Sequence, residues 1–233
     1  MHSYIILNEK KSTNVKGLLI QSLPPVSKPL MRTSIEQIDG RDGDIVTKLG
    51  YSAYNKQFKI GLHGNYSIDE VIEYFDSEGT VTFSNEPDKF YIYQILSQID
   101  FERLIRFRTA TVTMHCQPFK YSAVDKALNF SGNNESMNVF NAGNIYAKPK
   151  ITIFGSETIN LSLNGNQIFV ISLGTEESIT IDSDKMEAYR DGILKNRQVV
   201  GDYDNLLFKP GRNTLTWNGN VEKISIENYS RWL

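Results

Sequence analysis

The chain has 233 residues, 25 basic and 27 acidic side chains, a formal net charge of −2 and 40% hydrophobic residues. This length fits one large or two small domains, and the apolar content is enough for packed cores, which excludes wholesale disorder. The near-zero net charge excludes a whole-protein field that would recruit nucleic acid or an anionic membrane.

Cysteine content and hydropathy limit the class further. Cys116 is the only cysteine, so an internal disulfide or a cysteine-rich metal site cannot form. The opening residues contain only a short apolar run, and no later run approaches the roughly 18 residues of a membrane span. We therefore expect a protein made without export and stabilised by packing and assembly.

The segment DGRDGD, from Asp39 to Asp44, comes directly before the alternating run IVTKLGY. Its acids do not have EF-hand spacing, because a count from Asp39 places Arg41 and Gly43 where acids belong. Aspartate and glycine before a strand are better explained by turn geometry. We predict a turn here, with a calcium site of another type as the alternative.

The next segments predict strands around one helix. Phe58, Ile60 and Leu62 alternate with other residues, as on a strand. Residues 67–78 predict an amphipathic helix, with Ser67 and Glu70 as a capping box and Gly79 as its stop. The outer acids of this helix favour a solvated face over a metal or acid-base site. These acids are Asp69, Glu70, Glu73 and Asp76.

A second alternating run predicts a long strand that carries basic side chains. Ile105 and Phe107 face one side and Arg106 and Arg108 the other, and the strand continues until Pro118. With Arg103, these arginines form a basic stripe that could face nucleic acid or an acidic partner. A solvated or salt-bridged face is the favoured interpretation.

The second half predicts hairpins. Residues 126–146 are rich in Asn, Ser and Gly, which indicates a linker or an opening segment. Three dipeptides then predict type I′ turns between strands. They are Asn164-Gly165, Asp191-Gly192 and Asn218-Gly219. This pattern is typical of an all-β sandwich or jelly roll.

Nucleophile patterns are weak. The run Gly50–Tyr54 begins like a nucleophile elbow, but Tyr54 occupies the position of the second glycine. His115 neighbours Cys116, yet adjacent strand residues point to opposite faces. A glycosidase carboxylate pair is recognised by the distance between its two carboxyl groups, which the sequence does not give. A glycosidase therefore stays a third class of function, as an alternative. Trp217 could stack on a sugar, although core packing is the favoured interpretation.

The order of features resembles the distal tail protein family of long non-contractile-tailed phages. The resemblance covers nearly the whole chain. It rests on the RDG turn at Arg41–Gly43, the N-x-G-N segment at Asn141–Asn144 before Pro149, and the closing series DG, N-R, GDY and PG-x-N-T-L-T-W that includes Trp217.

The resemblance implies a mainly β protein of two domains. Residues 1–125 would be a β-sandwich-like, ring-forming domain with one short helix, and residues 147–233 a galectin-like or carbohydrate-module-like β-sandwich. A homo-hexamer ring would join the tail tube protein to the baseplate or a tip fibre at the distal end of the virion tail. The ring would leave a channel for the tape measure and DNA, and the outer domain would dock receptor-binding proteins.

The resemblance implies no catalysis, cofactor, metal or membrane insertion. The chain would be made in the host bacterial cytoplasm. We expect Arg41, Asp42 and Gly43 to contribute ring contacts, and Arg106 and Arg108 to line the channel or a partner face. The main alternative is a carbohydrate-binding module that contacts host cell-wall polysaccharide through Trp217.

Overall fold

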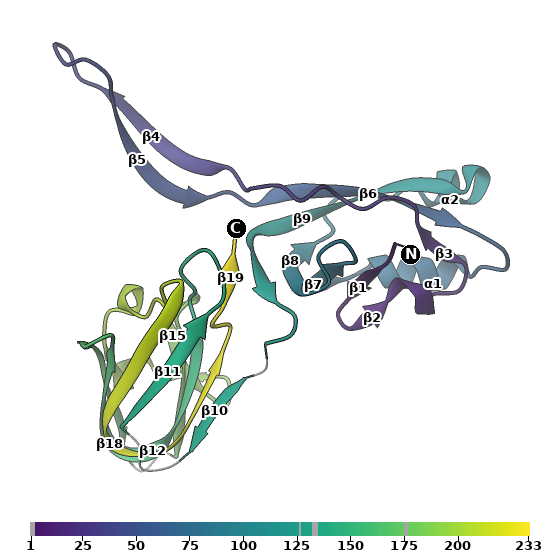
Figure 1. Cartoon of the computed structure of the whole chain (residues 1–233). Coiled ribbons are helices and arrows are strands. Elements are labelled where there is room, and N and C mark those ends of the chain that lie inside the picture. The colour runs from purple at the N-terminus through teal and green to yellow at the C-terminus, as the bar shows by residue number, and fades with distance from the viewer. Residues whose placement is uncertain (1–2, 126, 132–134, 175–176) are drawn as a thin grey trace. The chain divides into compact units, whose positions relative to one another are not determined.

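The structure is a computed structural model that describes residues 3–125, 127–131, 135–174 and 177–233. Internal contacts divide the chain into two compact units, with the boundary between Ala123 and Val124. Both units are built mainly of β-strands (Figure 1), which confirms the predicted fold class. Neither α-helix in these residue ranges is long and apolar enough to cross a membrane.

The first unit has a main sheet in the order β2-β1-β7-β8-β9-β6-β3 and a separate pair, β4 with β5. Its strands are β1 (Ile5–Leu7), β2 (Lys10–Lys11), β3 (Leu18–Ile20), β4 (Met31–Gln37), β5 (Asp44–Tyr51), β6 (Tyr54–Leu62), β7 (Glu78–Phe83), β8 (Lys89–Gln94) and β9 (Thr109–Ser122), with a 3-10 turn at Ser12–Asn14. The alternation in β6 is confirmed, because Phe58, Ile60 and Leu62 are buried in the core of this unit.

Helix α1 (Ile68–Phe75) begins where its cap predicts. The hydroxyl of Ser67 accepts from the backbone N–H of Glu70 at 3.5 Å. The Glu70 carboxylate instead accepts from the Lys16 backbone, so only half of the capping box forms. The stop at Gly79 is wrong, because the helix ends at Phe75 and Gly79 lies in β7, where an added Cβ would lie 2.1 Å from Asn8 Oδ1.

A second helix, α2 (Phe101–Phe107), corrects both the single helix and the strand predicted over this segment. Asp100 caps it by accepting from the Arg103 backbone N–H at 2.7 Å. Arg106 and Glu102 add an ion pair with i,i+4 spacing at 2.7 Å. The helix ends at Phe107, and the next residue, Arg108, has a left-handed φ of 57°. The alternation of apolar and basic residues over 105–108 therefore did not indicate a strand, because residues 101–107 are helical.

Strand β9 runs through Pro118, contrary to the predicted stop. The pairing of β9 with β6 ends at Cys116, and the pairing with β8 shifts register between Tyr91 and Tyr93. Pro118 lies in this irregular stretch, where no regular ladder hydrogen bond requires its missing N–H. The strand therefore continues to Ser122.

The second unit has strands ordered β10-β18-β12-β14-β15-β16, with β11 on β18 and with β13 between β12 and β17. Its strands are β10 (Leu128–Ser131), β11 (Ser136–Asn141), β12 (Lys150–Leu163), β13 (Asn166–Gly174), β14 (Ser178–Asp182), β15 (Glu187–Arg190), β16 (Ile193–Leu194), β17 (Val199–Gly201), β18 (Gly211–Glu227) and β19 (Arg231–Trp232), with 3-10 turns at Asn196–Gln198 and Tyr203–Asn205. The segment 126–146, expected as a linker or opening segment, thus contains β10 and β11, and both pair with β18.

The long strands β12 and β18 connect the two halves of this sandwich. One end of β12 pairs with β14 and the other with β13, and the register with β18 shifts between these ends. At the bend the backbones approach closely, because a Cβ on Gly155 would lie 2.1 Å from Asn220 O and one on Gly219 would lie 2.5 Å from Thr158 O. Bulges and glycines of this kind let a strand turn a corner between layers.

Two of the three predicted turns are confirmed. Asn164 and Gly165 have φ of 52° and 85°, and Asp191 and Gly192 have φ of 49° and 77°, as a type I′ turn requires. The third is wrong, because Asn218-Gly219 lies inside β18. There the glycine serves the close approach to β12 described above.

Candidate functional site

The first unit carries an exposed two-stranded arm. Strands β4 and β5 pair with each other and with no other strand among the described residues (Figure 1). The predicted turn at DGRDGD is confirmed and forms the tip of this arm, where Gly40 and Gly43 take φ of 80° and 78°. Arg41, Asp42 and Gly43 are all exposed there.

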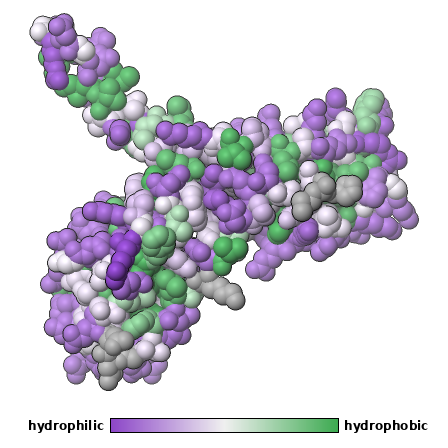
Figure 2. Space-filling view, in the orientation of Figure 1, coloured by the Kyte–Doolittle hydropathy of each residue, from purple (hydrophilic) through white to green (hydrophobic). Residues whose placement is uncertain are grey.

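The arm carries apolar side chains that it does not bury. Ile35 and Val46 are directly opposite each other across the pair and are 60% and 56% exposed. Figure 2 shows hydrophobic side chains on the projecting arm. Further exposed apolar residues on the arm and the chain leading to it are Val26, Leu30, Ile38 and Leu49. An isolated two-stranded hairpin is at best marginally stable in water, and its free edges invite pairing with another chain.

The chain enters the arm through a short extended segment, which we call the root, residues 24–27. Three backbone carbonyls of the root accept hydrogen bonds from side chains of the main sheet and its connections. Asn85 donates to Pro24 O at 3.1 Å, Lys56 Nζ donates to Pro25 O at 3.1 Å, and Tyr54 donates to Ser27 O at 3.5 Å. Pro24 and Pro25 have no N–H, so the root cannot add to the sheet there as an ordinary strand.

Lys56 is the unusual member of this group, because it is only 3% exposed. Its ammonium lies 4.6 Å from the ring centroid of Tyr91, 5.1 Å from that of Tyr54 and 5.9 Å from that of Phe83. These distances suit cation–π attraction. Burial lowers the pKa of Lys56 and raises the pKa of Tyr54 to about 12.

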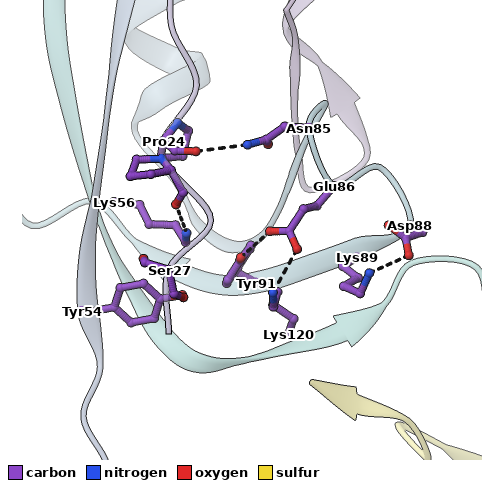
Figure 3. A network of polar contacts seen from close by, with 11 residues as sticks. Pro24, Ser27, Tyr54, Lys56, Asn85, Glu86, Asp88, Lys89, Tyr91 and Lys120 are labelled. Atoms are coloured by element: carbon purple, nitrogen blue, oxygen red, sulfur yellow. Dashed lines mark hydrogen bonds and ion pairs between the residues drawn. The ribbon is translucent and has the colours of Figure 1, made fainter. Parts of the chain in front are cut away.

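Glu86, the carboxylate near Lys56, interacts with other side chains. Glu86 accepts from Tyr91 at 2.7 Å and forms a buried ion pair with Lys120 at 2.9 Å (Figure 3). Among the residues that the structure describes, no carboxylate lies within ion-pair distance of Lys56. The lysine therefore satisfies its ammonium with a backbone carbonyl of the root and with aromatic faces.

Sequence reasoning missed Lys56, although a signal was present. Lys56 is in phase with Phe58, Ile60 and Leu62 on β6, two residues before the first of them. A period-two pattern sends all four side chains to the same face of the strand. A lysine on the core phase of a strand predicts either an exposed strand end or a buried cation, and the structure has the latter.

The arginines form no strand face. Arg106 is paired with Glu102 on α2, as noted above, and the Arg108 guanidinium lies 4.6 Å from the Tyr66 ring centroid. Arg103 lies 5.8 Å from the Phe107 ring centroid. All three side chains are exposed. A channel-lining or partner-binding role for Arg106 and Arg108 stays a prediction.

Cys116 and His115 lie in surroundings that do not favour nucleophilic catalysis. Cys116 is fully buried and burial raises its pKa to about 12, while His115 contacts Asn55 at 3.0 Å. A thiol held neutral in this way is a poor nucleophile. No group of three or more His, Cys, Asp or Glu side chains that could hold a metal occurs in the described ranges.

Trp217 is not a surface platform. Its side chain is 6% exposed and packs edge-on against Phe130 at 5.7 Å between centroids. This position agrees with core packing, the interpretation favoured from the sequence, and leaves little of the side chain exposed for the alternative of stacking on a sugar.

The N-x-G-N segment has a structural explanation. Asn141 is 1% exposed and donates to Ile145 O at 2.9 Å and Phe208 O at 3.0 Å, and it accepts from Gly143 N at 2.8 Å. A Cβ on Gly143 would lie 1.9 Å from Arg231 O. The motif thus holds the end of β11 against Arg231 of β19.

Comparisons by sequence find no match, since no protein-family model and no curated protein matches the chain. Among solved structures, the Dit protein (gp 19.1) of phage SPP1, described as a paradigm of the hub adsorption apparatus in Gram-positive infecting phages, aligns over 100% of both chains with a TM-score of 0.65 and 16% identity.

Two further chains come from structures of the phage P2 baseplate in its activated conformation, with Ca and with Sr. They align over 97% of this chain and over 96% and 97% of their own, at 13% and 12% identity, with TM-scores of 0.47 and 0.48. The alignment with SPP1 Dit confirms the resemblance to distal tail proteins at the level of the fold, over both units.

Proposed function

We propose that this chain is a structural virion protein that forms a ring at the distal end of a phage tail. The ring joins the tail tube to the baseplate or a tip fibre and leaves a channel for the tape measure and DNA. The observation that carries this proposal is the full-length fold likeness to a phage hub protein. Following the family resemblance, we propose six copies in the ring and the second unit as a docking platform for receptor-binding proteins.

The arm is the element that we propose for contacts between neighbouring copies. It presents free strand edges, exposed apolar side chains and the Arg41–Gly43 tip. A contact in which one copy offers its arm and the next a different surface is heterologous, and such contacts close into rings. Covering the arm would also protect edges that a monomer leaves open.

The surface that we propose to receive the arm lies along β3, at the edge of the main sheet. Strand β3 pairs only with β6 among the described strands, and a cleft of about 650 Å³ borders it. The cleft is lined by residues 12–20 together with Ser3 and His63. Leu19 on β3 is 38% exposed, so the arm of a second copy would meet both an open edge and apolar surface.

Disulfide crosslinking tests this contact without interference, because Cys116 is buried. A chain carrying Leu19→Cys should crosslink to a chain carrying Ile35→Cys under mild oxidation. The matched control pairs Leu19→Cys with Ile193→Cys, which is exposed on the second unit. Equal crosslinking of both pairs, or none with Ile35→Cys at concentrations where the chain is assembled, would overturn the arm contact.

A second candidate function is carbohydrate binding by the second unit. The observation that favours it is a polar cleft of about 460 Å³ beside the β12–β13 turn. Its polar lining includes Asn164, Asn166, Gln167, Asp204 and Asn205. Amide and carboxylate groups of this kind hydrogen-bond to sugar hydroxyls.

Isothermal titration of the full chain with solubilised cell-wall polysaccharide tests this candidate. Binding that is lost in Gln167→Ala and kept in Trp217→Phe would support the polar cleft. Absence of binding at millimolar polysaccharide would reject carbohydrate binding by the second unit.

A further inference from the structure

Burial of Lys56 is unfavourable for the stability of the first unit taken alone. An ammonium removed from water has a large desolvation penalty, which an adjacent carboxylate would offset. Glu86, the carboxylate of this cluster, is engaged by Lys120 and Tyr91, and Lys56 relies on the faces of three aromatic rings and on Pro25 O. An apolar side chain of similar volume would fill the same space without the penalty.

What the lysine does accomplish is to hold the root. Residues 24–27 form no strand ladder, and with two consecutive prolines the root offers mainly carbonyl oxygens for attachment. Lys56 donates to Pro25 O, while Asn85 donates to Pro24 O and Tyr54 to Ser27 O, the carbonyls on either side. A lysine suits this position because its ammonium is a donor on a long, flexible stem.

We propose that Lys56 is a positioning residue that fixes the root, and with it the direction in which the arm leaves the sheet. This inference rests on the proposed function, because a fixed arm matters if a neighbouring copy must receive it. Pre-ordering the arm lowers the entropy that association would otherwise lose. The chain thus bears the desolvation penalty of Lys56 and gains an arm with a fixed direction.

The test measures arm order in the full chain by pulsed electron paramagnetic resonance. Spin labels are attached at Asp42→Cys on the tip and at Glu73→Cys, which is exposed on α1, while Cys116 is buried and stays unlabelled. Labelled chain is diluted in unlabelled chain of the same kind, so that only distances within one copy are recorded. The probe therefore does not depend on assembly.

Lys56→Met should at least double the width of the distance distribution while the melting temperature stays equal or rises. The matched control, Lys59→Met, changes an exposed lysine on the same strand and should leave the width unchanged. Pro25 is exposed, so its released carbonyl can bind water. Asn85→Ala, at a surface position, releases Pro24 without touching the aromatic cluster and should also broaden the distribution.

An unchanged width in both Lys56→Met and Asn85→Ala would overturn the inference, as would a broadening that occurs only with a loss of melting temperature. The proposed function fails separately. If the wild-type chain never assembles, the ring is rejected and the positioning role of Lys56 is unaffected. If the wild-type chain forms rings but the distance distribution of Lys56→Met and Asn85→Ala is as narrow as that of wild type, the positioning role is rejected and the ring is unaffected.

Discussion

Replacing Ile35 and Val46 together with serine should weaken association between copies and leave the folded chain intact. The two side chains are opposite each other on the arm, and 60% and 56% of their surfaces are exposed in one copy. Full burial of such a side chain stabilises by about 1.5–3 kcal/mol, so covering the exposed part yields about 1–2 kcal/mol for each. The double variant should therefore lose about 3 kcal/mol per contact, a roughly 100-fold rise in the dissociation constant.

Sedimentation velocity over a concentration series measures this change. Because both residues are exposed, the free energy of unfolding of the double variant should stay within about 0.5 kcal/mol of wild type. Ile193→Ser is the matched control, since Ile193 is 64% exposed on the second unit. Association as tight as wild type in the double variant, or an equal loss in Ile193→Ser, would show that the arm does not form the contact between copies.

Three further outcomes follow from buried groups. Asn141→Ala should reduce the free energy of unfolding, measured in urea, by about 3 kcal/mol. The substitution removes several buried hydrogen bonds, each worth about 1 kcal/mol or more. Asn138→Ala, at an exposed position, should change the free energy of unfolding far less. Cys116 should react with a thiol reagent at pH 8 only after denaturation, because it is buried and its pKa is raised to about 12; reaction in native buffer at the rate of a free thiol would contradict this. Burial lowers the pKa of Lys56 below its ordinary value. Between the folded and the unfolded pKa the unfolded chain therefore binds more protons than the folded chain, and this group makes the free energy of unfolding rise with pH. The difference in unfolding free energy between wild type and Lys56→Met should therefore shift toward wild type from pH 8 to pH 10, and a constant difference would show that Lys56 does not titrate in this way.

Local patterns in the sequence predicted those parts of the fold that local rules determine. The alternation through Phe58, the Ser67 cap of α1 and the Asn164-Gly165 turn each depend on a few neighbouring residues, and each is present. The DGRDGD turn belongs to the same group. Its chemistry fixes a turn, but nothing local indicates that the flanking strands would pair only with each other.

The wrong predictions lie at positions where contacts with distant residues determine the local structure. Helix α2 replaced a predicted strand because Asp100 caps it and Leu104 is buried in the core, neither of which a two-residue alternation detects. The Asn218-Gly219 dipeptide is typical of a turn, yet Gly219 lies in β18, where the close approach of β12 leaves no room for a side chain. Trp217 was ambiguous by composition, and only the packing of the sandwich shows that it is covered.

The candidate site was half predictable for the same reason. The tip at Arg41–Gly43 was found from its residues, whereas the root was not, because its attachment depends on side chains from β6 and the β7–β8 connection. Lys56 carried a phase signal on β6, but only the structure identifies Pro25 as its partner. A lysine on a core phase is worth testing as a buried cation in other β proteins.

The ring is tested most directly by negative-stain electron microscopy of the purified chain combined with mass measurement of the same sample. We expect particles with an axial hole and a mass of six times the 26.5 kDa of one chain. A compact monomer that persists at high concentration would contradict it.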